Sequence, residues 1–342
     1  MTCVVGVDPG TISIDICGLR DGELTLDLAV PTAEALAEPE RFLNLLRGSG
    51  PVDLIAGPSG YGLPLRQAAG LSEEEFRLAF LAVEGDPGGI GGLRRLMRSL
   101  ANSGLPVLLT PGVMHLPTVP AHRKLNRVDL GTADKVAAAV LGIADHCARF
   151  GRPPTECSFI LLELGGAFTS ALAIEDGQIV DGFGGTSGSI GWRSSGAWDG
   201  EVAFLAERVT KDSLFRGGAV EAGHETGRVA YVEGAAKAVR ALMHSVRRPR
   251  EILLSGRNAG EPQIRGLLDD ALHVLAPVRD LTGFAKIAKQ GAQGAAIMAD
   301  GLAGGVHSAI VERLGLREAS GTVLDHLLVI SKADARRRLG LA

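Results

Sequence analysis

Residues 159–182 read Phe159-Ile-Leu-Leu-Glu-Leu-Gly-Gly-Ala-Phe-Thr-Ser-Ala-Leu-Ala-Ile-Glu-Asp-Gly-Gln-Ile-Val-Asp-Gly, and this stretch decides the fold because it repeats the pattern of the N-terminus. The N-terminal copy reads Cys3-Val-Val-Gly-Val-Asp-Pro-Gly-Thr-Ile-Ser-Ile-Asp-Ile-Cys-Gly-Leu-Arg-Asp-Gly-Glu-Leu. In both copies an apolar run ends in an acid, passes a glycine turn with Thr or Ser, resumes as a strand and turns again at Asp-Gly. Two hairpins of one design predict two similar halves.

Each glycine turn has the chemistry of a phosphate-binding loop. Gly10 in the first copy, and Gly165 with Gly166 in the second, let backbone N–H groups approach an anion without a Cβ in the way. Hydroxyl groups add donors at Thr11, Ser13, Thr169 and Ser170. The acid before each turn, Asp8 or Glu163, ends a strand where it can hold Mg²⁺ or a metal-bound water. One such hairpin alone is most simply an ordinary turn, so the prediction depends on the repetition.

A third segment, Glu251-Ile-Leu-Leu-Ser-Gly-Arg-Asn-Ala-Gly, is predicted to be a short buried strand followed by a helix. In order and spacing the three segments resemble the phosphate-1, phosphate-2 and adenosine motifs of the acetate kinase, sugar kinase, Hsp70 and actin superfamily. The resemblance implies an α/β fold of two actin-like (ribonuclease H-like) domains with an ATP cleft between them. It also implies that Gly256 and Asn258 belong to the adenosine site, with the glycine packed against adenosine.

A helix beginning near Lys289 is rich in glycine and alanine and resembles the connecting helix of that superfamily. Small residues allow two helices to cross closely between the domains, although plain close packing explains the composition equally well.

More narrowly, the chain resembles a family of archaeal and bacterial proteins of unknown function that are predicted to be butyrate kinases. The likeness spans nearly the whole chain and is carried by Leu125-Asn-Arg-Val-Asp-Leu-Gly-Thr-Ala-Asp-Lys, Leu162-Glu-Leu-Gly-Gly-Ala-Phe-Thr and Asp181-Gly-Phe-Gly-Gly-Thr-Ser-Gly. Since the activity of that family is itself a prediction, the resemblance supports the fold more strongly than the substrate.

Length and composition agree with two domains. The chain has 342 residues, of which 46% are hydrophobic, enough for two cores. We expect an N-terminal actin-like domain at 1–150 with a helical insert at about 58–120, and a C-terminal one at 151–342. We leave open whether the last helices return to the first domain. The net charge of −4 and a mixed surface argue against a nucleic-acid partner.

The four cysteines have no CxxC spacing, so reduced thiols and a cytoplasmic location are the simplest expectation. Apolar stretches break well before the roughly 18 residues that a membrane span requires, so none is expected. Superfamily kinases of this size often dimerise through the C-terminal domain, and we therefore predict a homodimer.

The local patterns predict a helix over 33–47, a strand over 52–56, two helices within 71–103 and a strand over 106–110. Residues 111–126 contain three prolines and predict an extended connection. The next helix is predicted to begin at Thr132, a good N-cap, and to end at about Phe150.

The start of that helix supplies the candidate catalytic residues. Asp129 lies just before it and Asp134 lies in its first turn, where a carboxylate is stabilised with or without a chemical role. By similarity to the Gly-x-Asp-Arg motif of type III pantothenate kinases, Asp134 is a candidate base for a substrate hydroxyl. Lys135 stands where that motif has Arg, and Lys135 or Arg127 is a candidate to hold an anionic substrate.

These features predict an ATP- and Mg²⁺-dependent kinase that transfers the γ-phosphoryl group of ATP to a small acceptor, which the closer resemblance implies is a short-chain carboxylic acid. A carboxylate is already ionised and needs no base, so catalysis would come from positioning and cationic stabilisation. The alternative is a slow ATPase that acts as a nucleotide-driven switch or reactivating factor for a protein partner. A metal-dependent carbamoyl transferase is disfavoured, since the eight histidines contain no His-x-x-x-His pair.

Overall fold

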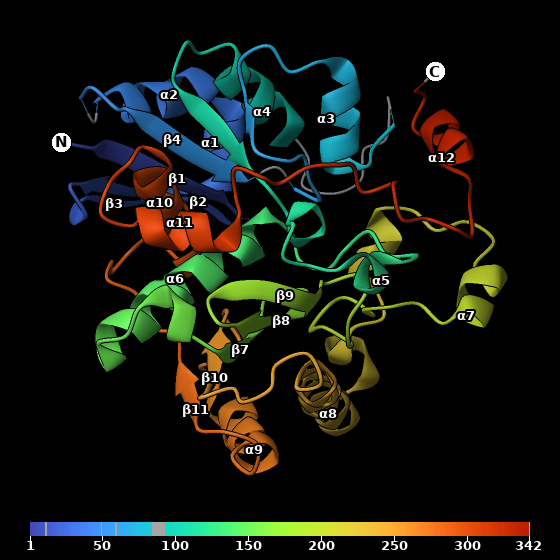
Figure 1. The fold of residues 1–342 in the computed structure, drawn as a ribbon. Coiled ribbons are helices and arrows are strands. Elements are labelled where there is room, and N and C mark those ends of the chain that lie inside the picture. The colour runs from blue at the N-terminus through green and yellow to red at the C-terminus, as the bar shows by residue number, and fades with distance from the viewer. Residues whose placement is uncertain (11, 49, 59, 84–92, 342) are drawn as a thin grey trace.

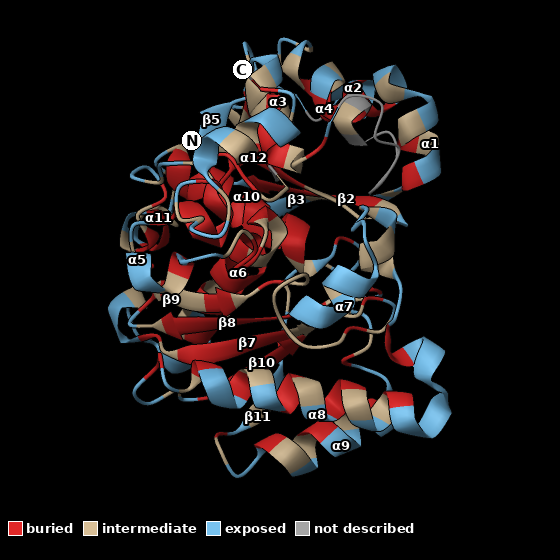
Figure 2. Ribbon diagram, turned by 90° about the vertical axis from the view of Figure 1, so that its right-hand side faces the viewer, coloured by how far each residue is buried: buried red, intermediate tan, exposed pale blue. Residues whose placement is uncertain are grey.

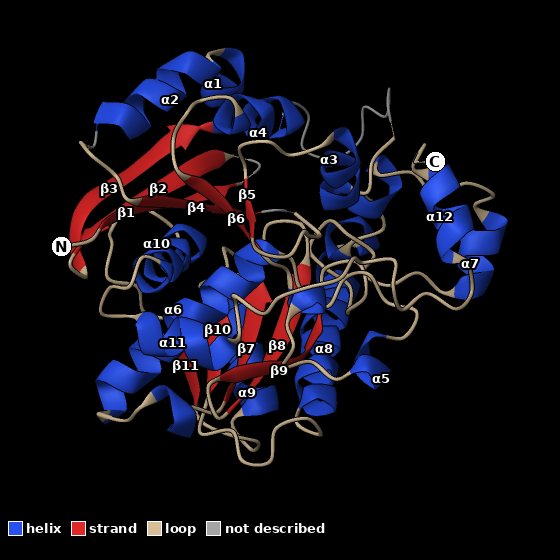
Figure 3. Cartoon of the chain, turned by 45° about the horizontal axis from the view of Figure 1, so that its top comes forward, coloured by secondary structure: helices blue, strands red, loops and turns tan. Residues whose placement is uncertain are grey.

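Two β-sheets lie on either side of a pair of central helices in the computed structural model (Figures 1 and 3). The structure describes residues 1–10, 12–48, 50–58, 60–83 and 93–341. The chain builds most of the first sheet and its helices, passes through the long helix α6 (Ala133–Phe150), and then builds the second sheet.

The first sheet has the strand order β3-β2-β1-β4-β6-β5. Its strands are β1 (Cys3–Pro9), β2 (Ser13–Arg20), β3 (Glu23–Pro31), β4 (Leu54–Pro58), β5 (Arg66–Gln67) and β6 (Val107–Thr110). Strands β1 to β3 form an antiparallel meander, whereas β1, β4 and β6 run parallel. The carboxyl ends of β1, β4 and β6 therefore meet at one edge, where an α/β sheet presents its loops to a ligand.

The second sheet has the order β11-β10-β7-β8-β9, which repeats the arrangement of the first. Its strands are β7 (Phe159–Leu164), β8 (Thr169–Glu175), β9 (Gln178–Phe183), β10 (Ile252–Ser255) and β11 (Val278–Asp280). Again three antiparallel strands are followed by two that run parallel to the first. The sequence repeat is therefore a repeat of topology.

The two meanders correspond residue by residue, without insertion or deletion. Asp8 pairs across its hairpin with Asp15, and Glu163 pairs in the same way with Ser170. A register shift follows Gly18 on β2 and recurs at the corresponding place on β8. The second turn is also shared, because Asp21 and Asp176 both have positive φ and are each followed by a glycine with positive φ.

The helices agree in outline with the sequence expectations. They are α1 (Thr32–Ala37), α2 (Pro39–Gly48), α3 (Glu73–Phe80), α4 (Leu93–Ala101), α5 (Ala121–Lys124), α6, α7 (Gly200–Leu205), α8 (His224–Leu242), α9 (Pro262–Leu272), α10 (Gln290–Leu302), α11 (Ser308–Leu314) and α12 (Lys332–Arg338). Helix α6 begins after Thr132 and ends at Phe150 before Gly151 in the left-handed conformation, as predicted.

Three local predictions need correction. The helix predicted over 33–47 is two helices, because Pro39 lacks the N–H that would continue the first one. The strand predicted over 52–56 runs from Leu54 to Pro58. The connection 111–126 is not wholly extended, since its prolines flank two short helical turns, at Val113–His115 and at α5. The sequence Glu84-Gly-Asp-Pro-Gly-Gly predicts a joint between the two helices within 71–103, and this segment lies outside the described residues.

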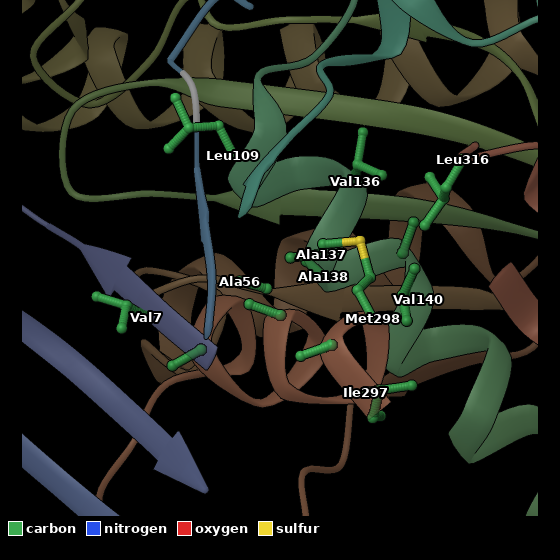
Figure 4. Close-up of a cluster of buried hydrophobic side chains, with 14 of the residues drawn as sticks. Val7, Ala56, Leu109, Val136, Ala137, Ala138, Val140, Ile297, Met298 and Leu316 are labelled. Carbon is green, nitrogen blue, oxygen red and sulfur yellow. The ribbon is translucent and has the colours of Figure 1, made fainter. Parts of the chain in front are cut away.

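Helices α6 and α10 pack against each other in the core (Figure 4), and their main chains approach closely at Gly294. A Cβ on Gly294 of α10 would lie 1.8 Å from the carbonyl oxygen of Ala137 on α6. On its other side α10 packs on β1, where a Cβ on Gly6 would lie 2.1 Å from the nitrogen of Ala296. The expectation that small residues permit a close crossing is therefore confirmed. Through α10, the chain returns to the first sheet after completing the second.

A separate apolar core lies on the outer face of the second sheet, under α8 and α9 (Figure 2). Tyr231 of α8 is its largest fully buried side chain. The main core joins the first sheet, α6 and α10. None of the described helices is long and apolar enough to cross a membrane.

The helix crossing predicts unequal effects of the same substitution. Gly294→Ala inserts a methyl group into the backbone of α6, and we expect it to lower the free energy of unfolding by about 1–3 kcal/mol or more. The matched control is Gly266→Ala in α9, where the Cβ meets nothing within 4 Å. Because alanine favours a helix over glycine, this control is expected to be neutral or slightly stabilising. Urea unfolding of both variants is the measurement, and equal effects would contradict the proposed packing constraint.

Candidate functional site

The first hairpin closes a tight turn between β1 and β2. The N–H of Gly10 donates to the carbonyl oxygen of Ser13 at 2.9 Å, and a Cβ on Gly10 would lie just as near to that oxygen. The turn therefore has no room for a side chain at this position. The hydroxyl group of Ser13 donates to Asp15 at 2.9 Å. Thr11, a predicted donor to phosphate, lies outside the described residues.

A lysine that the sequence analysis did not select contacts the same turn. Lys289, the N-cap of α10, donates from Nζ to Asp15 Oδ2 at 2.9 Å and to the hydroxyl oxygen of Ser13 at 2.5 Å. These partners lie at the opposite end of the sequence, so spacing alone does not reveal the contact. The only sequence signal is a basic residue directly before the small-residue helix.

The second hairpin repeats the turn of the first. The N–H of Gly165 donates to the carbonyl oxygen of Phe168 at 2.9 Å, as Gly10 does to Ser13. Within the described chain, no heavy atom lies within 4 Å of the position of a Cβ on Gly166, so this glycine borders open space. Such a turn keeps the backbone accessible to an anion.

The two predicted hydroxyl donors of the second hairpin lie on opposite faces of the sheet. Neighbouring side chains of a strand alternate between its faces. Thr169 is on the face of the outer core, beside the hydroxyl group of Tyr231. Ser170 is on the inner face, which packs toward α6. Both side chains are buried, and only Ser170 faces the side on which the central helices lie.

Lys135 forms a bridge between α6 and the second hairpin. Its Nζ donates to Asp134 Oδ2 at 2.7 Å and to Glu163 Oε1 at 2.6 Å. Burial lowers the pKa of Lys135, but the charges of Asp134 and Glu163 and their hydrogen bonds outweigh burial and hold the pKa well above its ordinary value. Lys135 is therefore a permanently charged ammonium group with two carboxylate partners.

The pKa values of the two acids beside Lys135 are shifted in opposite directions. Burial raises the pKa of Asp134, but Lys135 and the hydroxyl group of Thr132 outweigh burial and hold the pKa below its ordinary value. For Glu163, burial is the largest influence and raises the pKa in spite of Lys135. Asp134 is consequently an ionised and poorly basic group, which matters for its predicted role as a proton acceptor.

Asp8 faces the same cluster from the end of β1. Burial, together with the negative charges of Asp134, Asp15 and Glu163, raises the pKa of Asp8 to about 7 against the opposing effect of Lys135. Its carboxylate packs on the first turn of α10, where a Cβ on Gly291 would lie 2.3 Å from Oδ2. The acids of both hairpins are therefore members of one electrostatic site.

This site suits a divalent cation that arrives with a ligand better than a cation held by protein alone. No group of three or more His, Cys, Asp or Glu side chains within the described ranges is arranged to hold a metal. The predicted pair, Asp8 and Glu163, supplies two carboxylates, and Mg²⁺ bound with a nucleotide typically takes one or two carboxylates and completes its shell with phosphates and waters. The donor set fits that mode.

Asp129, predicted as a catalytic residue, is occupied by structural hydrogen bonds. It is buried and accepts from the N–H of Gly131 at 3.1 Å and from the N–H and hydroxyl groups of Thr186, each at 2.9 Å. Burial raises its pKa although these donors oppose the change. The close approach of Gly184, whose Cβ would collide with the carboxylate, completes the contact. In this arrangement Asp129 ties the loop after β9 to the start of α6.

Arg127 retains a charge without a carboxylate partner among the described residues. Its guanidinium group lies 5.0 Å from the centre of the Phe183 ring, at the end of β9. A guanidinium group stacked on an aromatic ring keeps its N–H donors for another partner. Of the predicted substrate-holding residues, Arg127 is thus better placed than Lys135 to accept a new anion.

The third motif packs on the second hairpin. The amide group of Asn258 donates to the carbonyl oxygen of Gly165 at 2.9 Å, and its N–H donates to that of Leu164 at 2.9 Å. Gly256 has φ of +88°, and a Cβ there would lie 2.6 Å from the backbone of Leu164. The structure thus supplies a reason for this glycine besides the predicted contact with adenosine, which remains a prediction.

A family model described as "Protein of unknown function (DUF1464)" matches residues 6–329. No curated protein sequence matches the chain.

Among solved structures, similar folds include two acetate kinases and a propionate kinase. The acetate kinase of Entamoeba histolytica has a TM-score of 0.55 and 11% identity, covering 80% of this chain and 87% of that one. The acetate kinase of Porphyromonas gingivalis has a TM-score of 0.55 and 14% identity, covering 80% and 88%. The propionate kinase of Francisella tularensis subsp. tularensis has a TM-score of 0.58 and 10% identity, covering 86% and 99%. The predicted actin-like fold class is confirmed over most of the chain.

The raised pKa of Asp8 predicts how stability depends on pH. The folded state binds the proton of the Asp8 carboxyl group more tightly than the unfolded state does. The contribution of Asp8 to the free energy of unfolding therefore falls as the pH rises from about 4 to about 7. Asp8→Asn removes this effect. We expect the free energy of unfolding of the variant, relative to the native protein, to increase over that range by a few kcal/mol at most.

Asp270→Asn on the exposed surface of α9 is the control for the change in charge. Urea unfolding at intervals of pH gives both differences. A difference for Asp8→Asn that does not vary with pH would contradict the electrostatic coupling of the site.

Proposed function

This chain belongs to the DUF1464 family, whose function is unknown, and we propose that it is an ATP-dependent kinase that phosphorylates a short-chain carboxylic acid such as butyrate. The observation that carries the proposal is that two corresponding glycine hairpins, each with its acid and its lysine, contribute to one electrostatic site. Phosphoryl transfer depends on positioning and on charge stabilisation more than on covalent chemistry by the protein, and the site offers both.

In this proposal the hairpins hold the phosphates of ATP. Backbone N–H groups at the turns of Gly10 and of Gly165 with Gly166 bind phosphate oxygens, and Ser13 adds its hydroxyl group when that group turns from Asp15 to the phosphate. Asp8 and Glu163 would hold Mg²⁺, which supplies neutralisation of the charge on the transferring phosphoryl group. The fold shared with acetate and propionate kinases supports this use of the two hairpins.

The state of Asp134 favours a carboxylic acid over an alcohol as acceptor. An alcohol must lose a proton, and an efficient base has a pKa near the working pH. Asp134 is a poor acceptor for that proton, because Lys135 and Thr132 hold its pKa below the ordinary range. A carboxylate acceptor is already ionised and requires only a cation to approach the γ-phosphate. Arg127 is the residue we assign to that role, since its guanidinium group has no carboxylate partner within the described chain.

The test is ADP formation from Mg²⁺ and ATP with a panel of short carboxylic acids, pantothenate-like alcohols and no acceptor. With a carboxylic acid, we expect Asp134→Asn to keep the rate within about tenfold, because loss of a general base costs at least a hundredfold. Arg127→Met is expected to lower the rate on the order of a hundredfold, as removal of one transition-state charge contact does.

The alternatives give different results. ADP release only with an alcohol, abolished in Asp134→Asn, would make Asp134 the base and exclude the carboxylic acid. Slow ADP release that ignores every acceptor would instead favour a nucleotide-driven switch for a protein partner. Thermal unfolding of each variant separates loss of activity from loss of fold.

A further inference from the structure

Lys289 is held at the first hairpin by strand β2, and the residues before it are held by strand β3. Its side chain donates to Asp15 and Ser13 on β2, and its backbone N–H donates to Asp15 Oδ1 at 3.3 Å. The residues before it are fixed by Asp27 on β3, whose carboxylate accepts from the N–H groups of Lys286, Ile287 and Ala288 at 2.8, 3.0 and 2.6 Å. Three N–H groups on one carboxylate fix the backbone that leads to Lys289.

Lys135, the lysine that contacts the second hairpin, has more carboxylate partners and is less exposed than Lys289. Lys135 contacts two carboxylates and has 17% of its side chain exposed, whereas Lys289 contacts one carboxylate and has 51% exposed. An ammonium group has three N–H donors, and the described partners of Lys289 take two. Lys289 therefore combines a fixed position at a glycine turn with access to solvent and an incompletely compensated charge.

We propose that Lys289 binds the terminal phosphates of the nucleotide at the first hairpin, and that Asp15 and Asp27 position it. The inference rests on the proposed function, because it assigns a residue to the polyphosphate of that ligand. Lysine suits this task since its ammonium group is a compact point charge that contacts phosphate oxygens without a planar geometry. The Asp15 contact fixes the side chain in the absence of ligand and leaves a donor for the phosphate.

The experiment measures equilibrium binding of ATP, tripolyphosphate and adenosine by calorimetry, each in the presence of Mg²⁺. A hydrogen bond to a charged group contributes about 1.5–3 kcal/mol. Lys289→Met is therefore expected to weaken the binding of ATP and of tripolyphosphate by roughly ten- to a hundredfold. Adenosine is expected to bind unchanged. Lys237→Met is the control, because it removes the same charge from an exposed side chain on α8, and we expect less than a twofold effect.

The positioning role of Asp27 needs a separate readout. Asp27→Asn is expected to weaken the binding of tripolyphosphate severalfold in the native protein. In a protein that already carries Lys289→Met, it is expected to have no further effect on this binding. Equal effects in both backgrounds would mean that Asp27 acts only on stability, and that part of the proposal would be overturned.

The outcomes also separate this inference from the proposed function. If the native protein and Lys289→Met bind Mg²⁺-ATP equally well, the assignment of Lys289 is wrong, but the proposed kinase function is not contradicted. If Lys289→Met loses adenosine and tripolyphosphate alike, Lys289 has a structural role and the assignment is again wrong. If the native protein binds neither ATP nor tripolyphosphate, the proposed function fails and the assignment fails with it.

Discussion

The contact between α6 and α10 is the constraint on which the rest of the structure depends. Gly294 lies against the backbone of Ala137, so the two helices are as near as their main chains permit. Because α10 also packs on β1, the crossing helps to fix the two sheets and their hairpins relative to each other. Lys135 and Lys289 stand at the beginnings of these helices, so core packing determines where the two cations lie.

The balance of charge around the hairpins explains which ligand suits them. Asp8, Asp15, Asp134 and Glu163 face two lysines, and burial together with mutual repulsion raises the pKa of Asp8 to about 7. A free polyphosphate would add to this repulsion, whereas one that carries a divalent cation relieves it. Under the proposed function, the site is therefore expected to take a metal-bound nucleotide in preference to a free one. Within it, Lys135 keeps the acids together and Lys289 stands nearer the solvent.

Features encoded by neighbouring residues could be predicted from the sequence, whereas those that depend on distant partners could not. The hairpins were visible because their strands, acids and glycines lie within a few positions of one another, and α6 because Thr132 and Gly151 mark its ends. Lys289 was missed because Asp15 and Asp27 lie at the far end of the chain. The hydrogen bonds of Asp129 to Thr186 were hidden for the same reason, and the charge state of Asp134 depends on contacts that no spacing reveals.

The return of α10 to the first sheet has a consequence for synthesis on the ribosome. Strand β1 is made well before the helix that covers its Gly6, because that helix follows both sheets in the chain. The first sheet must therefore wait, with part of its apolar face uncovered, until α10 has been made. Contacts between such distant segments slow folding and prolong the exposure of aggregation-prone surface.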